Sequence, residues 1–367
     1  MLKKNYIKNI LRLSSILFIL LQLSCVQDKK RENIIVASAG KIESIDPAQA
    51  NTLRTLQILT ALGDTLYKIN KEGNLSPNLA SSLPKTSRNR LLIDIPLKEN
   101  ITFHDGSIFN AKAMKFSLDR FMNIGTLNYL LNDKIESVEA KEEFLLRIKL
   151  KRPSSSLKSL LTSVNLTPVS PNSYSNFKDK FNNKSFVGTG PYFLENFSSN
   201  QQKIKPFKNY WGEKPLNNGI DFVNYSNSST LFGAIRASEV DVLISNSIDD
   251  LQRLTLNNMV KNKKIKSGEG APLEIGYITF KSNKLPLENK TIRQALSYTL
   301  DRELISKQVS FGTREPLRSI VPPHLNKKDF SPWPKYDPVF ARFLLKKEGY
   351  CERNILTIPL TFRSNIP

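Results

Sequence analysis

The sequence predicts an exported α/β protein with more than one domain. Strand-like runs alternate with segments of helical spacing along most of the chain. Its 367 residues, 40% of them hydrophobic, suffice for two domains with sizeable cores. A basic and then apolar amino terminus indicates secretion.

Residues 1–24 are predicted to be a secretory signal. The apolar run from Leu11 to Leu23 is shorter than the roughly 20 residues that span a bilayer. Ser24 precedes Cys25, which stands where a bacterial lipoprotein signal places the cysteine that becomes diacylated. We therefore predict lipidation of Cys25 and a tether over 25–33, whose basic residues would favour anionic headgroups. An ordinary cleaved signal and an unprocessed anchor are the alternatives.

The charge balance is strongly basic, at +21, and removing the signal takes away four basic residues and no acidic one, which leaves +17. Such an excess of basic residues is typical of proteins that bind nucleic acid. The basic residues are scattered and no nucleic-acid module motif is present, so we predict no such partner. With Cys351 as the only other cysteine, no disulfide framework is expected, and Cys351 is predicted to be a small buried residue.

The first half of the mature chain carries local signals for strands and capped helices. Asp46-Pro47 favours a turn, Asn100 tolerates left-handed backbone, and Asn110 is a suitable N-cap. The predicted strands are 34–37, 91–97, 134–140 and 144–150, and the predicted helices are 52–66 and 111–121.

The stretch from Val187 to Gly212 contains Gly188-Thr189-Gly190-Pro191-Tyr192 and then Asn209-Tyr210-Trp211-Gly212. Gly188 and Gly190 predict a tight turn, since glycine reaches positive φ without a steric clash. No phosphate loop follows, because Gly-Lys-Ser/Thr and the three-glycine fingerprint are both absent from the sequence. Tyr210 and Trp211 are predicted to be core aromatics.

The second half contains further helix and strand signals. Residues 228–237 predict a capped helix, and Asp301 and Asp337 are suitable N-caps, with Pro338 in a first turn and Gly349 at a helix end. The segments 276–280 and 355–362 are predicted to be strands. Nothing in the sequence would pair the second of these.

These segments together resemble the bacterial extracellular solute-binding proteins of family 5, which serve dipeptide and oligopeptide importers. The matching motifs occur in the family's order, and Leu83, Asn100 and Ser238 depart from its pattern. The matching motifs lie at residues 44–47, 79–106, 116–120, 187–212, 239–243, 292–302 and 336–350. The resemblance implies a two-lobed periplasmic-binding-protein fold of type II-like architecture, with an inserted α+β subdomain and an incomplete second lobe. It places the main lobe at 34–53 and 186–272, the subdomain at 54–185 and the start of the second lobe at 273–367.

The resemblance also implies a function. The protein would be the monomeric substrate-binding component of an ABC importer, capturing short peptides in the periplasm and delivering them to permease subunits. By position, Asn51, Leu53 and Tyr277 would contact the ligand by strand addition. A nickel, haem or sugar carrier is an alternative within this class. Two alternatives fall outside the class of transport components. They are a lipoprotein with an interaction or chaperone-like role and a non-functional truncated receptor.

The residues predict neither an enzyme, a cofactor nor a metal site. The two histidines, His104 and His324, and the two cysteines form no ligand cluster in sequence. His104 beside Asp105 could act as a base, but a turn held by local hydrogen bonds is the favoured interpretation. No nucleophile elbow is present.

Overall fold

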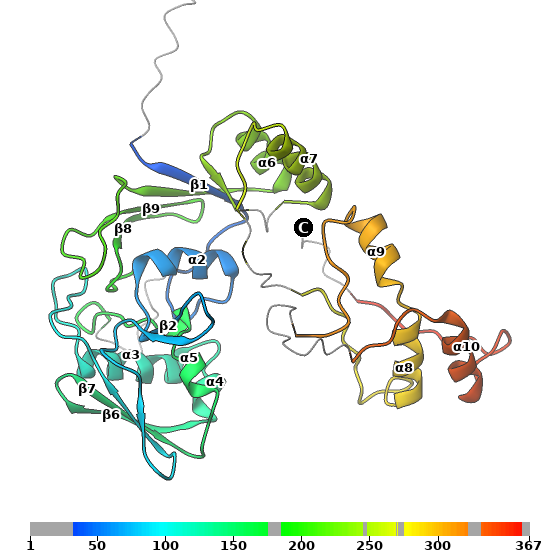
Figure 1. Cartoon of the computed structure of the whole chain (residues 1–367), viewed down its shortest axis with the longest axis horizontal. Helices are drawn as coiled ribbons and strands as arrows, with labels where there is room; N and C mark the ends of the chain where they lie inside the picture. Colours follow the sequence, from blue (N-terminus) through cyan, green and yellow to red (C-terminus); the bar gives the residue numbers. More distant parts are fainter. Residues whose placement is uncertain are drawn as a thin grey trace, which may run out of the picture. The chain divides into compact units, whose positions relative to one another are not determined.

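The computed structural model describes residues 32–174, 185–244, 248–268, 270, 275–321 and 332–361. The chain divides into two compact units (Figure 1). Unit 1 contains residues 41–224, with short pieces at 240–242 and before residue 37, and unit 2 contains 37–40, 225–239 and the chain from 243 onward. The predicted signal and Cys25 lie outside the described residues.

A five-stranded sheet is the framework on which the candidate site is built. Its strand order is β11-β1-β10-β9-β8, and β9 pairs antiparallel with both β10 and β8. The strands are β1 (Ile34–Ala39), β8 (Tyr192–Phe197), β9 (Gln201–Pro206), β10 (Ile220–Tyr225) and β11 (Val242–Leu243). The strand predicted at 34–37 is confirmed and is two residues longer.

Helix α2 (Leu53–Leu62) packs its apolar face against this sheet. Ile58, Leu59 and Leu62 are buried in one cluster with Ile204 of β9. The helix is shorter than the predicted 52–66, because Gly63 adopts extended backbone with φ −151° and ends it. The chain then forms a two-stranded sheet, β2 (Tyr67–Ile69) with β3 (Leu75–Pro77).

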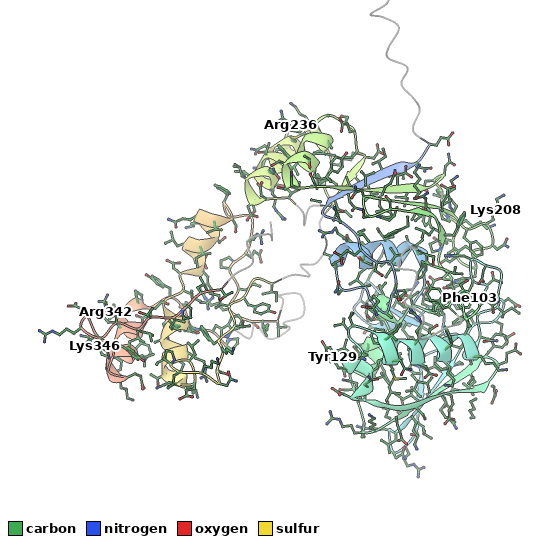
Figure 2. All side chains as sticks on the ribbon, turned by 180° about the vertical axis from the view of Figure 1, so that it is seen from behind. Phe103, Tyr129, Lys208, Arg236, Arg342 and Lys346 are labelled. Atoms are coloured by element: carbon green, nitrogen blue, oxygen red, sulfur yellow. The ribbon has the colours of Figure 1, made fainter. Side chains whose placement is uncertain are left out.

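A four-stranded antiparallel sheet and a helix make the second core of unit 1. The strand order is β4-β5-β7-β6, and α3 (Ala111–Ile124) packs on it. Met114, Leu118 and Phe121 of α3 are buried there, as their spacing predicts, and Phe103 lies inside the same cluster (Figure 2). The remaining elements are β4 (Lys85–Thr86), β5 (Leu92–Pro96), β6 (Ile135–Glu142), β7 (Leu145–Leu150), α4 (Tyr129–Asn132), α5 (Leu157–Leu160) and η1 (Val164–Leu166).

Local capping chemistry is confirmed where the sequence predicted it. The side chain of Asn110 accepts a hydrogen bond from the backbone N–H of Ala113 and begins α3. Asn100 is left-handed, with φ 59°. The two strands predicted between 134 and 150 are β6 and β7.

Unit 2 contains five of the described helices. They are α6 (Ser228–Arg236), α7 (Asp250–Lys261), α8 (Lys290–Tyr298), α9 (Arg302–Val309) and α10 (Pro338–Lys347). The predicted caps Asp301 and Asp337 accept hydrogen bonds from the backbone N–H groups of Leu304 and Phe340. Helices α8 and α10 pack together, and the Tyr298 and Phe340 rings meet edge to face at 4.9 Å. Gly349, with φ +87°, follows α10 as expected.

Two strand predictions are wrong. Residues 276–280 and 355–361 are irregular, and Phe362 lies outside the described residues. A strand forms when its backbone N–H and C=O groups find a neighbouring strand, and across the described ranges neither segment has one. The apolar residues that suggested the first strand are exposed instead, at 63% for Tyr277 and 53% for Ile278.

The burial predicted for Cys351 is also wrong, because the thiol is free and exposed. Cys351 and Asn354 exchange two backbone hydrogen bonds of 3.0 Å directly after α10. This tight turn holds the residue at the surface. Basic side chains share the surface of both units, among them Lys208, Arg236, Arg342 and Lys346 (Figure 2).

Candidate functional site

Residues 44–50, here called the Asp46 segment, fold around one buried carboxylate. The Asp46 Oδ1 atom accepts the backbone N–H of Ala48 at 3.0 Å, and the Asp46 N–H donates to Ser44 Oγ at 3.1 Å. The backbone N–H of Ala50 donates to the Asp46 carbonyl at 2.9 Å. The Asp-Pro turn predicted from sequence is therefore confirmed, with the aspartate side chain inside it.

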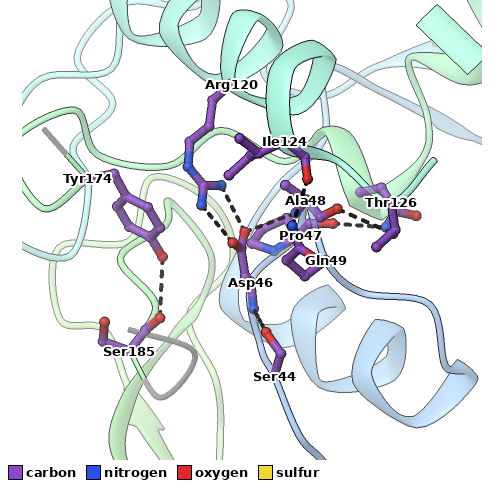
Figure 3. Close-up of polar contacts among 11 residues, drawn as sticks. Ser44, Asp46, Pro47, Ala48, Gln49, Arg120, Ile124, Thr126, Tyr174 and Ser185 are labelled. Carbon is purple, nitrogen blue, oxygen red and sulfur yellow. Dashed lines mark hydrogen bonds and ion pairs between the residues drawn. The ribbon is translucent and has the colours of Figure 1, made fainter. Parts of the chain in front are cut away.

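A second charged residue neutralises Asp46. Arg120 of α3 donates from Nη1 and Nη2 to the two carboxylate oxygens at 2.8 and 2.6 Å (Figure 3). The two side chains are 0% and 4% exposed. The Arg120 guanidinium also lies 5.0 Å from the centre of the Tyr174 ring, whose hydroxyl donates to the Ser185 carbonyl at 3.3 Å. This bidentate pair joins the Asp46 segment to α3.

Backbone groups of the Asp46 segment are held from other elements as well. Asn165 Nδ2 donates to the carbonyls of Pro47 and Ala50 at 2.9 and 2.7 Å. The backbone N–H of Thr126 donates to the Ala48 carbonyl at 2.9 Å. The segment is consequently a rigid support for the residues that follow it.

Two of the three predicted ligand-binding residues follow immediately. Asn51 is exposed, and neither its backbone N–H nor its C=O has a partner in the ranges that the structure describes. Thr52 caps α2 by accepting the N–H of Thr55, and Leu53, partly buried, is the first helical residue. The structure thus presents an unpaired backbone amide at Asn51, beside the start of α2.

The C-terminal end of α2 is fixed by another buried carboxylate, Asp64. It accepts hydrogen bonds from Trp211 Nε1 at 2.9 Å, from the Tyr210 hydroxyl at 3.2 Å and from Thr189 Oγ1 at 3.3 Å. Burial raises the pKa of Asp64, and these hydrogen bonds oppose that shift. Tyr210 and Trp211 were predicted to be core aromatics, and both are partly buried partners of Asp64. Trp211 also packs against the core of the four-stranded sheet, whereas Tyr210 contributes to neither hydrophobic core cluster of the described residues.

The glycines of the Gly-Thr-Gly turn serve a purpose that differs from the predicted one. Neither Gly188 nor Gly190 has a positive φ. A Cβ on Gly190 would lie 2.4 Å from the Gly63 nitrogen and from the Leu62 carbonyl carbon, and one on Gly188 would lie 2.8 Å from the Leu62 oxygen. Glycine is needed because two backbones approach closely at the end of α2.

His104 holds the same turn from the other side. Its Nδ1 accepts the Gly188 N–H at 3.3 Å, and its Nε2 lies 3.0 Å from the Gly190 carbonyl, which requires the proton on Nε2. Burial lowers the pKa of His104 to about 4. Asp105 accepts hydrogen bonds from the backbone N–H and the Oγ of Ser107, so the predicted local turn is confirmed. The side-chain hydrogen bonds of His104, in contrast, are made to residues far away in the sequence.

The third predicted residue, Tyr277, lies in unit 2, in the irregular segment 275–280, and is exposed. Asp46 was predicted from sequence to lie in a turn, whereas no role was predicted for Arg120, Asp64 or Asn165. The match of Phe116–Arg120 to a motif was the one signal that could have identified Arg120. Asp64 carried only the signal of an acidic residue directly after a helix-ending glycine.

Potential metal sites were sought among the side chains of the described ranges. No group of three or more His, Cys, Asp or Glu side chains could hold a metal ion there. Within the same ranges, none of the helices has the length and apolar character that crossing a membrane requires.

Comparison with known proteins identifies the family. The sequence model described as bacterial extracellular solute-binding proteins, family 5 middle, matches residues 74–365. The chain therefore belongs to the family 5 solute-binding proteins, and the predicted resemblance is confirmed.

Individual relatives are consistent with this assignment. The chain is 29% identical over 335 residues to the glutathione-binding protein GsiB of Escherichia coli O6:K15:H31, covering 90% of this chain and 64% of the relative. It thus spans about two thirds of the length of such curated relatives.

Solved structures show the same fold. A dipeptide-binding protein from Pseudoalteromonas sp. SM9913 in complex with Met-Leu aligns with a TM-score of 0.75 at 23% identity, over 87% of this chain and 67% of that one. NikZ from Campylobacter jejuni in complex with Ni(L-His) aligns with a TM-score of 0.69 at 24% identity, over 86% of this chain and 63% of NikZ. The predicted fold class, a periplasmic-binding-protein architecture, is confirmed.

Proposed function

We propose that this protein captures short peptides outside the cytoplasmic membrane as the substrate-binding component of an ABC importer and delivers them to permease subunits. The observation that carries the proposal is the unpaired backbone amide of Asn51, presented on the rigid Asp46 segment. An extended peptide recognises such a group by main-chain hydrogen bonds, which do not depend on the peptide's side chains.

The arrangement favours binding because its geometry exists before the ligand arrives. Asp46, Arg120 and Asn165 hold the turn by buried bonds, so little backbone entropy remains to be lost at Asn51 on binding. Relatives with 29% identity are glutathione-binding proteins, and glutathione is itself a short peptide-like solute. Membership of the family supports the transport role.

We further propose that the protein acts as a monomer in the periplasm, tethered by a lipid on Cys25. Leu53 would contribute to the same contact from the first turn of α2, and Tyr277 would cover the ligand from the second lobe. In this proposal the main lobe, the subdomain and the second lobe keep the boundaries predicted from sequence.

Peptide binding is tested by calorimetry on the purified full-length gene product with dipeptides to pentapeptides, glutathione and Ni(II)-histidine. A peptide at 100 times its dissociation constant should raise the free energy of unfolding by about 2.7 kcal/mol. Asn51→Pro removes the backbone donor and should abolish peptide binding, whereas Asn51→Ala keeps the donor and should preserve it. Binding of nickel-histidine alone, or full affinity in Asn51→Pro, would refute the proposal.

A further inference from the structure

Helix α10 buries only one of its sides. Ala341 is buried, and Leu344 and Leu345 are partly buried, and α8 packs against the helix. These three positions fall on one face of a helix with 3.6 residues per turn. The opposite face, here called the outer face of α10, is exposed to solvent. It consists of Val339, Arg342, Phe343, Lys346 and Lys347.

The centre of the outer face is apolar. Val339 and Phe343 stand four residues apart on adjacent turns and are 75% and 60% exposed. The Phe343 ring stacks on Phe340, with ring centres 6.0 Å apart, and the Phe340 ring in turn contacts Tyr298 of α8. Single apolar residues on a surface are ordinary, whereas neighbouring ones on one face indicate a contact surface.

The charged residues of α10 are sorted by side. Its acidic residues are the two caps: Asp337 accepts a backbone N–H of the first turn, and Glu348 accepts Asn289 Nδ2 at 2.6 Å, at the start of α8. The three basic residues belong to the outer face, where Figure 2 shows Arg342 and Lys346. Within the described ranges, none of these three side chains forms an ion pair. The outer face is therefore cationic around an apolar centre.

This combination matches the interface of an anionic bilayer. Lipid phosphates supply the counter-charges, and the layer beneath them removes apolar side chains from water. A protein cover without carboxylates would bury three unpaired cations, which is unfavourable, and a nucleic-acid backbone gives no apolar contact to Val339 and Phe343. The family is one of extracellular proteins, so a membrane surface lies within its compartment.

We propose that the outer face of α10 binds the anionic phospholipid surface of a membrane. Its two apolar side chains would insert among the headgroups, and its three basic side chains would contact lipid phosphates. The inference goes beyond peptide capture and does not depend on it. Docking would hold unit 2 at the bilayer by a contact separate from the predicted lipid on Cys25.

The test measures insertion of position 343 into vesicles. Phe343→Trp is made in the full-length gene product, which is mixed with vesicles whose acyl chains carry bromine, a contact quencher of tryptophan. Subtracting the wild type removes the emission of Trp211 and Trp333. We expect the added emission to be quenched in vesicles containing phosphatidylglycerol and to stay unquenched in pure phosphatidylcholine. About 1 M salt, where the Debye length is about 3 Å, should reverse the quenching.

Leu251→Trp is the matched control for insertion. Leu251 is 59% exposed on α7, but it follows the acidic residues Asp249 and Asp250, so its added emission should stay unquenched. Lys346→Gln tests the charge, because one basic residue near an anionic surface contributes about fivefold to binding. It should lower the ratio of docked to undocked protein by about fivefold, whereas Lys208→Gln, an exposed site in unit 1, should leave the ratio unchanged.

The melting temperatures of these variants show whether the fold is kept, and Lys346→Gln removes no ion pair of the described residues. Absence of quenching in anionic vesicles, equal quenching in neutral ones, or no effect of Lys346→Gln would overturn the inference. Absence of quenching together with dimers that Phe343→Ser dissociates would overturn it too and assign the face to a second copy of the chain. Peptide binding is measured without vesicles, so the proposed function would stand in each case.

Discussion

The carboxylate of Asp46 and the guanidinium of Arg120 form a bidentate ion pair, 2.8 and 2.6 Å long, that is almost completely shielded from solvent. The two residues are 74 positions apart in the chain. Their pair ties the turn that precedes Asn51 to the helix α3 of the neighbouring core. The backbone presented at the candidate site therefore depends on a residue outside it.

Removing one partner of this pair should be strongly destabilising. Arg120→Met leaves the buried Asp46 carboxylate without its counter-charge, which typically costs about 3–5 kcal/mol. Urea denaturation measures the change in the free energy of unfolding. Arg147→Met is the control, since the Arg147–Asp94 pair is 26% and 22% exposed and its loss should cost clearly less stability than the loss of the buried pair. Equal costs for the two variants would contradict a special role for the buried pair.

The close backbone approach at Gly190 should not tolerate a methyl group. Gly190→Ala would place Cβ 2.4 Å from two backbone atoms that no side-chain rotation can move. We expect a loss of about 1–3 kcal/mol or more, measured as a lower denaturation midpoint. Gly233→Ala is the matched control, because Gly233 lies in α6 with open space around it and should gain about 1 kcal/mol. A neutral Gly190→Ala would show that the backbones separate easily.

Acidification should weaken the protein through His104. Its pKa is lowered from 6.5 to about 4 in the folded state, so the unfolded chain takes up the proton first as pH falls. The contribution of neutral His104 to the free energy of unfolding is fully present above pH 6.5. It is lost progressively between pH 6.5 and 4, up to about 3 kcal/mol in total. Protonating Nδ1 also removes the acceptor for the Gly188 N–H.

The measurement is urea denaturation at several pH values for the wild type and for His104→Gln. Comparison with this variant separates His104 from the carboxylates that titrate over the same range. The variant should lose the additional pH dependence between pH 6.5 and 4. The same slope in both proteins would exclude His104 as its source.

Replacing Ser238 by glycine should stabilise the protein. Ser238 has φ 58° at the end of α6, where the N–H groups of Ser238 and Glu239 return to the carbonyls of Ile235 and Ala234. This is a Schellman motif, in which glycine avoids a left-handed penalty of roughly 1–2 kcal/mol. Because glycine is also more flexible when unfolded, Ser238→Gly should gain about 0.5–1 kcal/mol in thermal denaturation. Ser229→Gly, inside the same helix, should instead lose about 0.5 kcal/mol.

Local chemistry in the sequence determined much of this protein. Asn110, Asp301 and Asp337 cap their helices as predicted, because a short polar side chain before a helix satisfies N–H groups only a few residues away. The alternation in β6 and β7, the apolar face of α3 and the left-handed Asn100 follow from equally local rules. The motifs that occur in the family's order along the sequence also identified the family, and the match to the family's sequence model confirms it.

Only the tertiary structure decided which distant residues meet. Asp46 finds Arg120 across 74 positions, and Asp64 finds Trp211 across 147, and no periodicity encodes either pairing. The same reason explains the wrong predictions. An apolar run such as 276–280 becomes a strand only beside a partner, and Gly190 is required by a backbone that approaches from Leu62.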